Sequence, residues 1–217
     1  MDVSATPPLT KPRLRGILHL IGFVVAVALA PVFIVAADGH RLVSAVFALS
    51  VAACFGTSAL YHVRTWTPRL RLVMRRLDHA GVYLLIAGSY TPVALLVLQG
   101  AWRPTILTIV WAGAVVAIVT KVMWVEAPNW LAAATGIALG WVAIVALPQL
   151  VERLEPVAVG LLVAGGVAYT VGAIVYARRR PDPVPHVFGY HEVFHALTIV
   201  AIACHYVAIA FFVVDAA

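Results

Sequence analysis

The sequence has few charged residues, and this shortage excludes an ordinary soluble protein. Only 11% of its 217 residues are charged, about half the fraction found in soluble domains. In their place, 63% of the residues are hydrophobic and the mean hydropathy is +1.00. Such a composition is typical of a polytopic membrane protein, with little chain left for a soluble domain.

Cysteine is also scarce, which excludes two kinds of site. The two cysteines, Cys54 and Cys204, each lie inside an apolar segment. They suggest no disulfide framework, and two thiolates alone cannot complete a zinc site. The sequence also has no convincing internal repeat and no low-complexity tract.

Long apolar runs are what the sequence has in abundance. Seven segments are long enough to cross about 30 Å of hydrocarbon, and short loops should make successive helices antiparallel neighbours. We therefore predict an all-α membrane protein: a short tail at 1–15, then a single domain over 16–217 that forms a seven-transmembrane helix bundle. Pro92 should kink the third helix, and Gly136 and Gly140 should allow close helix contact in the fifth. The expected spans are 16–37, 42–63, 78–99, 104–125, 129–149, 156–177 and 190–214.

The basic residues lie mainly on one side of the predicted bundle. With seven spans, the tail and the even-numbered loops share a side with 12 of the 15 basic residues, and Arg41, Arg103 and Arg153 remain on the other. The positive-inside rule then predicts a cytoplasmic N-terminus and an extracytoplasmic C-terminus in the cell membrane. The same distribution accounts for the pI near 9.7 without nucleic acid as a partner.

Polar residues at the start of the seventh span indicate a site, because such residues are costly in a membrane and usually functional. His191 and His195 are four residues apart, so they share one face of a helix. Two imidazoles at this spacing can bind one metal ion, and neutral imidazole suits zinc. The alternative is that the two histidines form hydrogen bonds between helices.

The predicted topology brings a third histidine to the same membrane depth. His62 ends the second span in SALYH, at the cytoplasmic end where the seventh span begins. Together, His62, His191 and His195 would make a three-histidine site that leaves a position for water, the pattern of catalytic zinc.

Two carboxylates could orient that water or take its proton. We expect Asp78 to do so, because it opens the predicted third helix, whose N-terminus favours an anion, and Arg75 and Arg76 could hold it ionised. Glu192 lies about 100° round the helix from His191, so it either reaches the water or faces a neighbouring helix.

Three further polar residues are candidates for supporting roles. Ser58 lies one turn before His62, where it hydrogen-bonds a ligand, Asp78, or its own helix backbone. His79 should contact a neighbouring helix, because it points about 100° away from Asp78. His205 lies about 21 Å deeper than the histidine pair, where it lines a cavity or bonds a neighbouring helix.

At these residues the chain resembles a known family. SALYH, LDHAGVYLLIAGSYTP and HEVFHALTIVAIACH resemble the three signature blocks of the progestin and adipoQ receptor (PAQR) family, and the bacterial hemolysin III branch most closely. The resemblance spans Leu14 to Phe212. It implies a seven-helix bundle with a cytoplasmic N-terminus and zinc near the cytoplasmic face, held by residues matching His62, His191 and His195. The family's aspartate that contacts the zinc-bound water matches Asp78.

The resemblance also implies a function, zinc-dependent hydrolysis of lipid amides or esters in the manner of ceramidases, with membrane lipids as substrates. Three alternatives remain open. HEVFH is a literal H-E-x-x-H, the zinc-protease motif with Glu192 as its base, but no suitable third ligand follows it. A receptor-like or membrane-homeostasis protein would hold a structural zinc with Asp78 as a direct ligand. A pore-forming cytolysin would need a polar lining, which these spans do not show.

Overall fold

The computed structural model describes residues 11–215, and seven membrane-length spans make up most of them. Apart from an isolated bridge between Val184 and Phe188, these residues contain no β-structure, which confirms the expected all-α class. The tail residues 1–10 lie outside the described residues. The helices are α1 (Ile17–Ala36), α2 (Arg41–Val63), α3 (Pro68–Pro92), η1 (Val93–Val97), α4 (Trp102–Met123), α5 (Asn129–Gly140), η2 (Val142–Ala146), α6 (Leu147–Arg153), α7 (Pro156–Arg178), α8 (Tyr190–Ala208) and η3 (Ile209–Val213).

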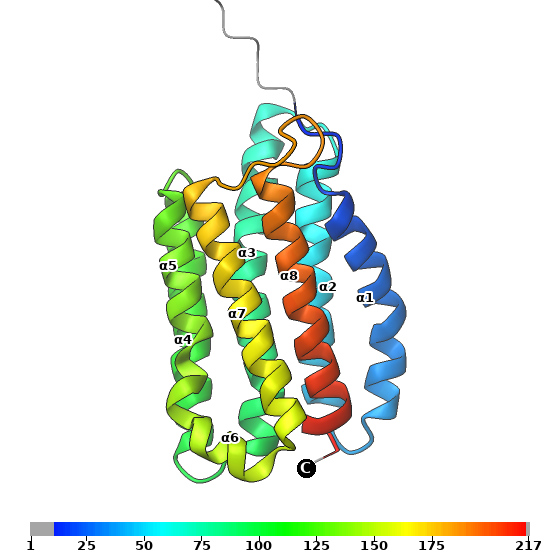
Figure 1. The fold of residues 1–217 in the computed structure, drawn as a ribbon, viewed down its shortest axis with the longest axis vertical. Coiled ribbons are helices and arrows are strands. Elements are labelled where there is room, and N and C mark those ends of the chain that lie inside the picture. The colour runs from blue at the N-terminus through cyan, green and yellow to red at the C-terminus, as the bar shows by residue number, and fades with distance from the viewer. Residues whose placement is uncertain (1–10, 216–217) are drawn as a thin grey trace, which may run out of the picture.

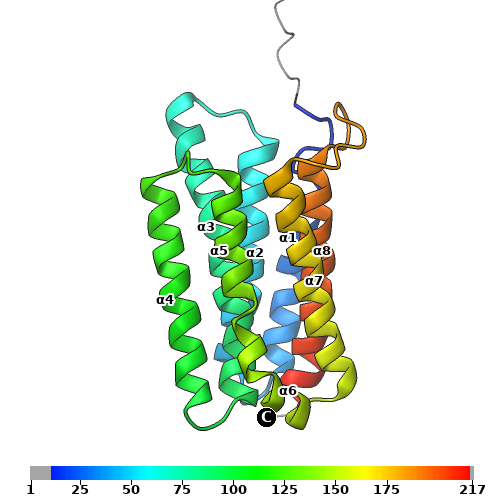
Figure 2. The same cartoon turned by 60° about the vertical axis from the view of Figure 1, so that its left-hand side comes forward.

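The spans run up and down along the long axis of the bundle (Figures 1 and 2). Neighbours in sequence pack as α1 with α2, α2 with α3, α3 with α4, and α7 with α8, whereas α5 packs chiefly against α7. The first described residues and the α7–α8 loop lie at one end, and the chain finishes at the other (Figure 1). We call the first of these the N-terminal end of the bundle.

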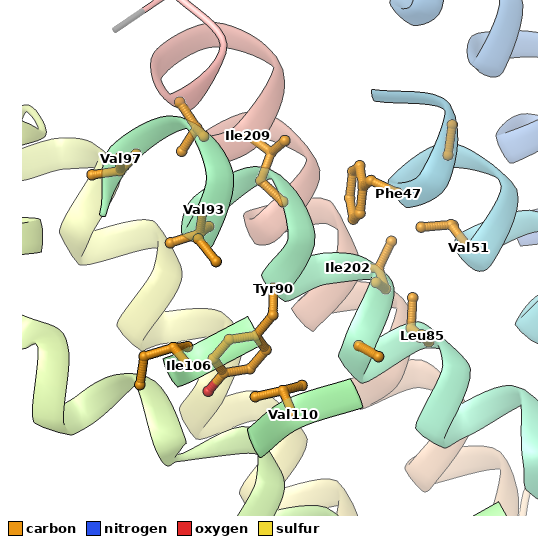
Figure 3. Packing of buried hydrophobic residues seen from close by; sticks show 14 of the residues in the cluster. Phe47, Val51, Leu85, Tyr90, Val93, Val97, Ile106, Val110, Ile202 and Ile209 are labelled. Atoms are coloured by element: carbon orange, nitrogen blue, oxygen red, sulfur yellow. The ribbon is translucent and has the colours of Figure 1, made fainter. Parts of the chain in front are cut away.

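Buried aromatic and branched side chains fill the centre of the bundle. Phe47 of α2, Leu85 of α3, Ile106 of α4 and Ile202 of α8 are each at most 5% exposed and belong to one cluster (Figure 3). Large apolar side chains on the outside remain exposed, as lipid-facing residues do; examples are Val24, Val32, Val116 and Phe211.

Close helix contact occurs at glycines other than the predicted pair. A Cβ added to Gly88 of α3 would lie 2.1 Å from Ser50 Oγ of α2. By contrast, a Cβ at Gly136 or Gly140 would meet no atom within 4 Å, so the prediction of close contact there was wrong. Both glycines line a cavity instead, because the absent side chains leave room there.

The third and fifth spans differ from the predicted ones. Helix α3 begins at Pro68, ten residues before the predicted start, because proline is well suited to the first helical position and the helix continues beyond its apolar part. Pro92 marks the point where α3 passes into the π-helix η1. The fifth span changes from α-helix to a 3₁₀ turn at Trp141 and resumes as α6.

Candidate metal centre

Three histidines from two helices meet at the N-terminal end of the bundle. His62 is in the last turn of α2, and His191 and His195 occupy the first two turns of α8. One ring nitrogen from each lies within 4.8 Å of the other two. The helical spacing of four residues places the α8 pair on one face, as the sequence predicts.

The Nε2 atoms of His62 and His191 are 3.1 Å apart and hydrogen-bonded between α2 and α8, which is the alternative role expected for histidines in this region. The same separation is close to the roughly 3.3 Å expected between two nitrogen ligands of one zinc ion. His195 Nδ1 is buried and has no hydrogen-bond partner among the described residues. These three residues could therefore hold a metal ion.

Asp78 lies beside this cluster. Its Oδ2 is 3.7 Å from His62 Nε2, and the side chain is 12% exposed. Because α3 begins at Pro68, Asp78 lies about three turns inside the helix. The helix N-terminus therefore does not stabilise an anion at this position, and that part of the prediction was wrong. Arg75 does not supply the expected countercharge either, because it pairs with Glu126 at 2.5 Å.

His19 is a site neighbour that sequence reasoning missed. Its ring stacks on that of His195, with centroids 3.7 Å apart and planes 9° from parallel. Its Nδ1 is 2.8 Å from Ser58 Oγ, so Ser58 contacts the residue that stacks on His195. The sequence could have indicated this role. His19 lies one turn into the first span, at the end of the bundle where the predicted topology places the other site residues.

Glu192 has a structural partner on each oxygen. Oε1 accepts an ion-paired hydrogen bond from Arg15 Nε, and Oε2 accepts one from the Gly189 backbone N–H at 2.8 Å, which caps the start of α8. The side chain is 1% exposed. Of the two predicted orientations, Glu192 therefore adopts the one that faces its neighbours.

The segment just before α1, residues 13–16, lies beside the histidine cluster at the N-terminal end of the bundle. The N–H groups of Arg13 and Leu14 donate to the carbonyls of His186 and Val187, at 3.0 and 3.2 Å. Gly16 adopts a positive φ of 87°, and a Cβ there would lie 2.6 Å from His62 Cβ. Only glycine combines this backbone conformation with so close an approach.

The two remaining candidate histidines are separate from the three-histidine group. His79 Nδ1 is buried without a partner among the described residues. His205 Nε2 lies 3.1 Å from the Leu162 carbonyl of α7. His205 also lines the cavity that Gly136 and Gly140 line, so it has both of the roles expected for it, a bond to a neighbouring helix and a place on the cavity wall.

A cavity of about 150 Å³ extends from the cluster into the bundle. Asp78, His191 and His195 line it at the end nearest the histidine cluster, and its lining is mostly apolar. Towards the middle of the bundle, Tyr90 and Trp141 line it, and both are held by hydrogen bonds, from Tyr90 Oη to the Gly140 carbonyl at 2.7 Å and from Trp141 Nε1 to Thr170 Oγ1 at 2.9 Å. The site thus combines polar groups with an apolar chamber.

Known proteins resemble this chain over most of its length. The family described as "Haemolysin-III related" matches residues 8–206. Hemolysin-3 of Bacillus cereus is 32% identical over 212 residues, covering 94% of this chain and 92% of that protein. The hemolysin-3 homolog of Bacillus subtilis (strain 168) is 30% identical over 205 residues, covering 92% and 93%.

The match extends to an animal protein. The adiponectin receptor protein of Drosophila melanogaster is 24% identical over 211 residues, which cover 87% of this chain and 47% of that protein. These matches confirm the resemblance drawn from the three sequence blocks. With the seven apolar helices, they also establish a multi-pass integral membrane protein.

Proposed function

The chain belongs to the haemolysin-III-related family, and from this premise we propose that it is a zinc-dependent hydrolase of membrane-lipid amides or esters. One observation carries the proposal: three histidines and a carboxylate meet at one end of a mostly apolar cavity. An acyl chain could lie against the apolar walls of the cavity, and a carbonyl group could lie at its polar end.

His62, His191 and His195 would hold the zinc. When bound, zinc polarises a carbonyl oxygen and acidifies water, which makes hydrolysis feasible at neutral pH. One ring nitrogen from each histidine lies within 4.8 Å of the other two, so the three could bind a single ion. His19 holds the ring of His195 by stacking, so the ligand is oriented before the ion arrives.

Asp78 is the residue that would move the proton. Its Oδ2 lies 3.7 Å from His62 Nε2, so it can accept a proton from the attacking water. The water oxygen forms a bond to the carbonyl carbon, the bond from that carbon to the leaving nitrogen or oxygen breaks, and Asp78 gives the proton to the leaving group. The products are a fatty acid and an amine or alcohol.

Glu192 is a poorer candidate for the base. Both of its oxygens already accept hydrogen bonds, from Arg15 and from the Gly189 N–H. In a zinc protease with H-E-x-x-H, the glutamate must be free to reach water. The contacts of Glu192 therefore favour Asp78.

A structural zinc is the second candidate function, because Asp78 lies close enough to the cluster to become a fourth ligand. In that case the protein would be a receptor-like, membrane-homeostasis or cytolytic protein; the name hemolysin belongs to its Bacillus relatives. A zinc-to-Oδ distance near 2 Å would identify Asp78 as a ligand, and a longer one would leave room for water.

Metal analysis and a lipid-product screen together test the proposal. The purified protein should contain about one zinc per chain and release fatty acid from short-chain ceramides, their phosphorylated forms or glycerolipid esters. The His191→Ala, His195→Ala double variant should do neither. Equal zinc or equal product in the two proteins would refute the proposal.

A further inference from the structure

A buried lysine faces the cavity from α4. Lys121 lies in the last turn of α4 and is 4% exposed. It lines the same cavity as Asp78 and His195. Lysine is rarely buried so fully unless it is paired, because its ammonium loses hydration. The groups around the Lys121 ammonium therefore indicate which kind of ligand the cavity could bind.

The protein supplies few partners for this ammonium group. Nζ donates a hydrogen bond to the Ala127 carbonyl at 3.2 Å, although an ammonium has three donors. Within residues 11–215, no carboxylate oxygen lies within 4.0 Å of it. Glu126, five residues further along the chain, is 71% exposed and pairs with Arg75. The hydrogen bond to Ala127 therefore uses one of the three donors of Lys121, and no carboxylate of the described residues pairs with it.

His79 adds a second unsatisfied group at the same place. Its Nδ1 is buried without a partner among the described residues, and it also lines the cavity. Lys121 of α4 and His79 of α3 therefore both line one cavity, and neither has a carboxylate partner among the described residues.

This corner of the cavity lies beside the metal centre. His79 directly follows Asp78, so on α3 it is about 1.5 Å further along and about 100° further round. Asp78 Oδ2 lies 3.7 Å from His62 Nε2, whereas His79 lines the cavity that Lys121 also lines. A lipid whose scissile bond lies at the histidine cluster could therefore place its headgroup at Lys121.

We propose that Lys121 and His79 form an oxyanion-binding subsite for the phosphate or carboxylate of an anionic lipid held in the cavity. The oxyanion provides the missing countercharge and accepts charge-assisted hydrogen bonds. As a statement about substrate class the inference rests on the proposed function: among lipid amides and esters, those with an anionic headgroup are preferred. Binding itself requires neither zinc nor hydrolysis.

Binding to metal-free protein tests the subsite separately from the reaction. Chelator-treated protein is titrated with dihexanoyl phosphatidate and with dihexanoylglycerol, which differ only in the phosphate. Wild type should bind the phosphate-bearing lipid at least about tenfold more tightly, since a charge-assisted pair is gained. Dodecanoate, which has one acyl chain and a carboxylate, tests whether the subsite binds a carboxylate instead of a phosphate.

Matched variants assign the preference to these residues. Lys121→Gln removes the charge and keeps an N–H donor for the Ala127 carbonyl, and it should abolish the preference; Lys121→Arg should keep it. His79→Gln should weaken the preference independently. Lys11→Met removes the chain's other lysine, which is exposed, and should leave the preference unchanged.

The outcomes separate the two proposals. Binding of the phosphatidate and of dodecanoate that is the same in wild type and in Lys121→Gln would overturn the subsite. Weaker binding of the phosphatidate by Lys121→Gln would assign the subsite to a phosphate headgroup, and weaker binding of dodecanoate alone would assign it to a fatty-acid carboxylate. Absence of hydrolysis by zinc-loaded protein, with Lys121-dependent binding intact, would count against the hydrolase only.

Discussion

Each histidine of the cluster has a close ring contact with another histidine. His195 stacks on His19, and the rings of His62 and His191 contact edge to face at 4.7 Å between centroids. Rings fixed in this way lose little conformational freedom when an ion binds. We therefore expect the cluster to bind metal tightly and to tolerate the loss of no ligand.

Substitution of a ligand tests this expectation at the residue scale. His191→Ala or His195→Ala should remove bound zinc almost completely, because an open site cannot spare one of three ligands. His79→Ala and His205→Ala are the controls and should retain it, since neither is in the three-histidine group. Metal analysis of the purified variants measures the effect; full zinc in either ligand variant would contradict the assignment.

The sequence predicted the histidine cluster but not its supports. Spacing on one helix and the charge rule place His62, His191 and His195 together, because both depend on local pattern. The stacking of His19 on His195 and the pairing of Arg15 with Glu192 depend on packing between residues 176 and 177 positions apart. No local pattern encodes such contacts.

At the scale of elements, apolar length predicted most helix limits within a few residues. The exception is α3, whose first turns carry arginines and continue beyond the apolar segment. The segment before α1 is a second element that hydropathy cannot describe. It hydrogen-bonds to the loop before α8, and Arg15 pairs there with Glu192. This segment thereby connects the first helix to the histidine-bearing one.

The Arg15–Glu192 pair should therefore stabilise the start of α8. Arg15→Gln leaves a fully buried carboxylate without its partner, which costs about 3 kcal/mol and should lower Tm by about 5–10 °C. Arg41→Gln is the matched control, because Arg41 and Asp38 form an exposed pair worth about 0–1 kcal/mol. Thermal unfolding of the purified variants measures both; equal Tm values would refute a stabilising role for the buried pair.

At the scale of the whole molecule, the seven spans of the described residues carry the chain from one end of the bundle to the other (Figure 1). The 12-to-3 division of basic residues predicts which side is cytoplasmic. A reporter fused after Ala217 should be exported, and one fused to the N-terminus should remain in the cytoplasm. A cytoplasmic C-terminal reporter would reverse the predicted orientation and move the histidine cluster to the outer face.

The bundle brings His62 of α2, Asp78 of α3 and the histidine pair of α8 together, and the role of Asp78 distinguishes the proposed hydrolase from a structural zinc protein. Asp78→Asn keeps the size of the side chain and removes its capacity to take a proton. Asp38→Asn, at an exposed position of the α1–α2 loop, is the matched control.

The most direct test is zinc content measured beside turnover of a short-chain ceramide or its phosphorylated form in these variants. We predict that Asp78→Asn retains most of its zinc and loses a factor of about 10²–10⁴ in rate, whereas Asp38→Asn matches wild type in both. Full turnover by Asp78→Asn, or loss of its zinc, would contradict the proposed role of Asp78 as the proton-accepting residue beside a three-histidine zinc site.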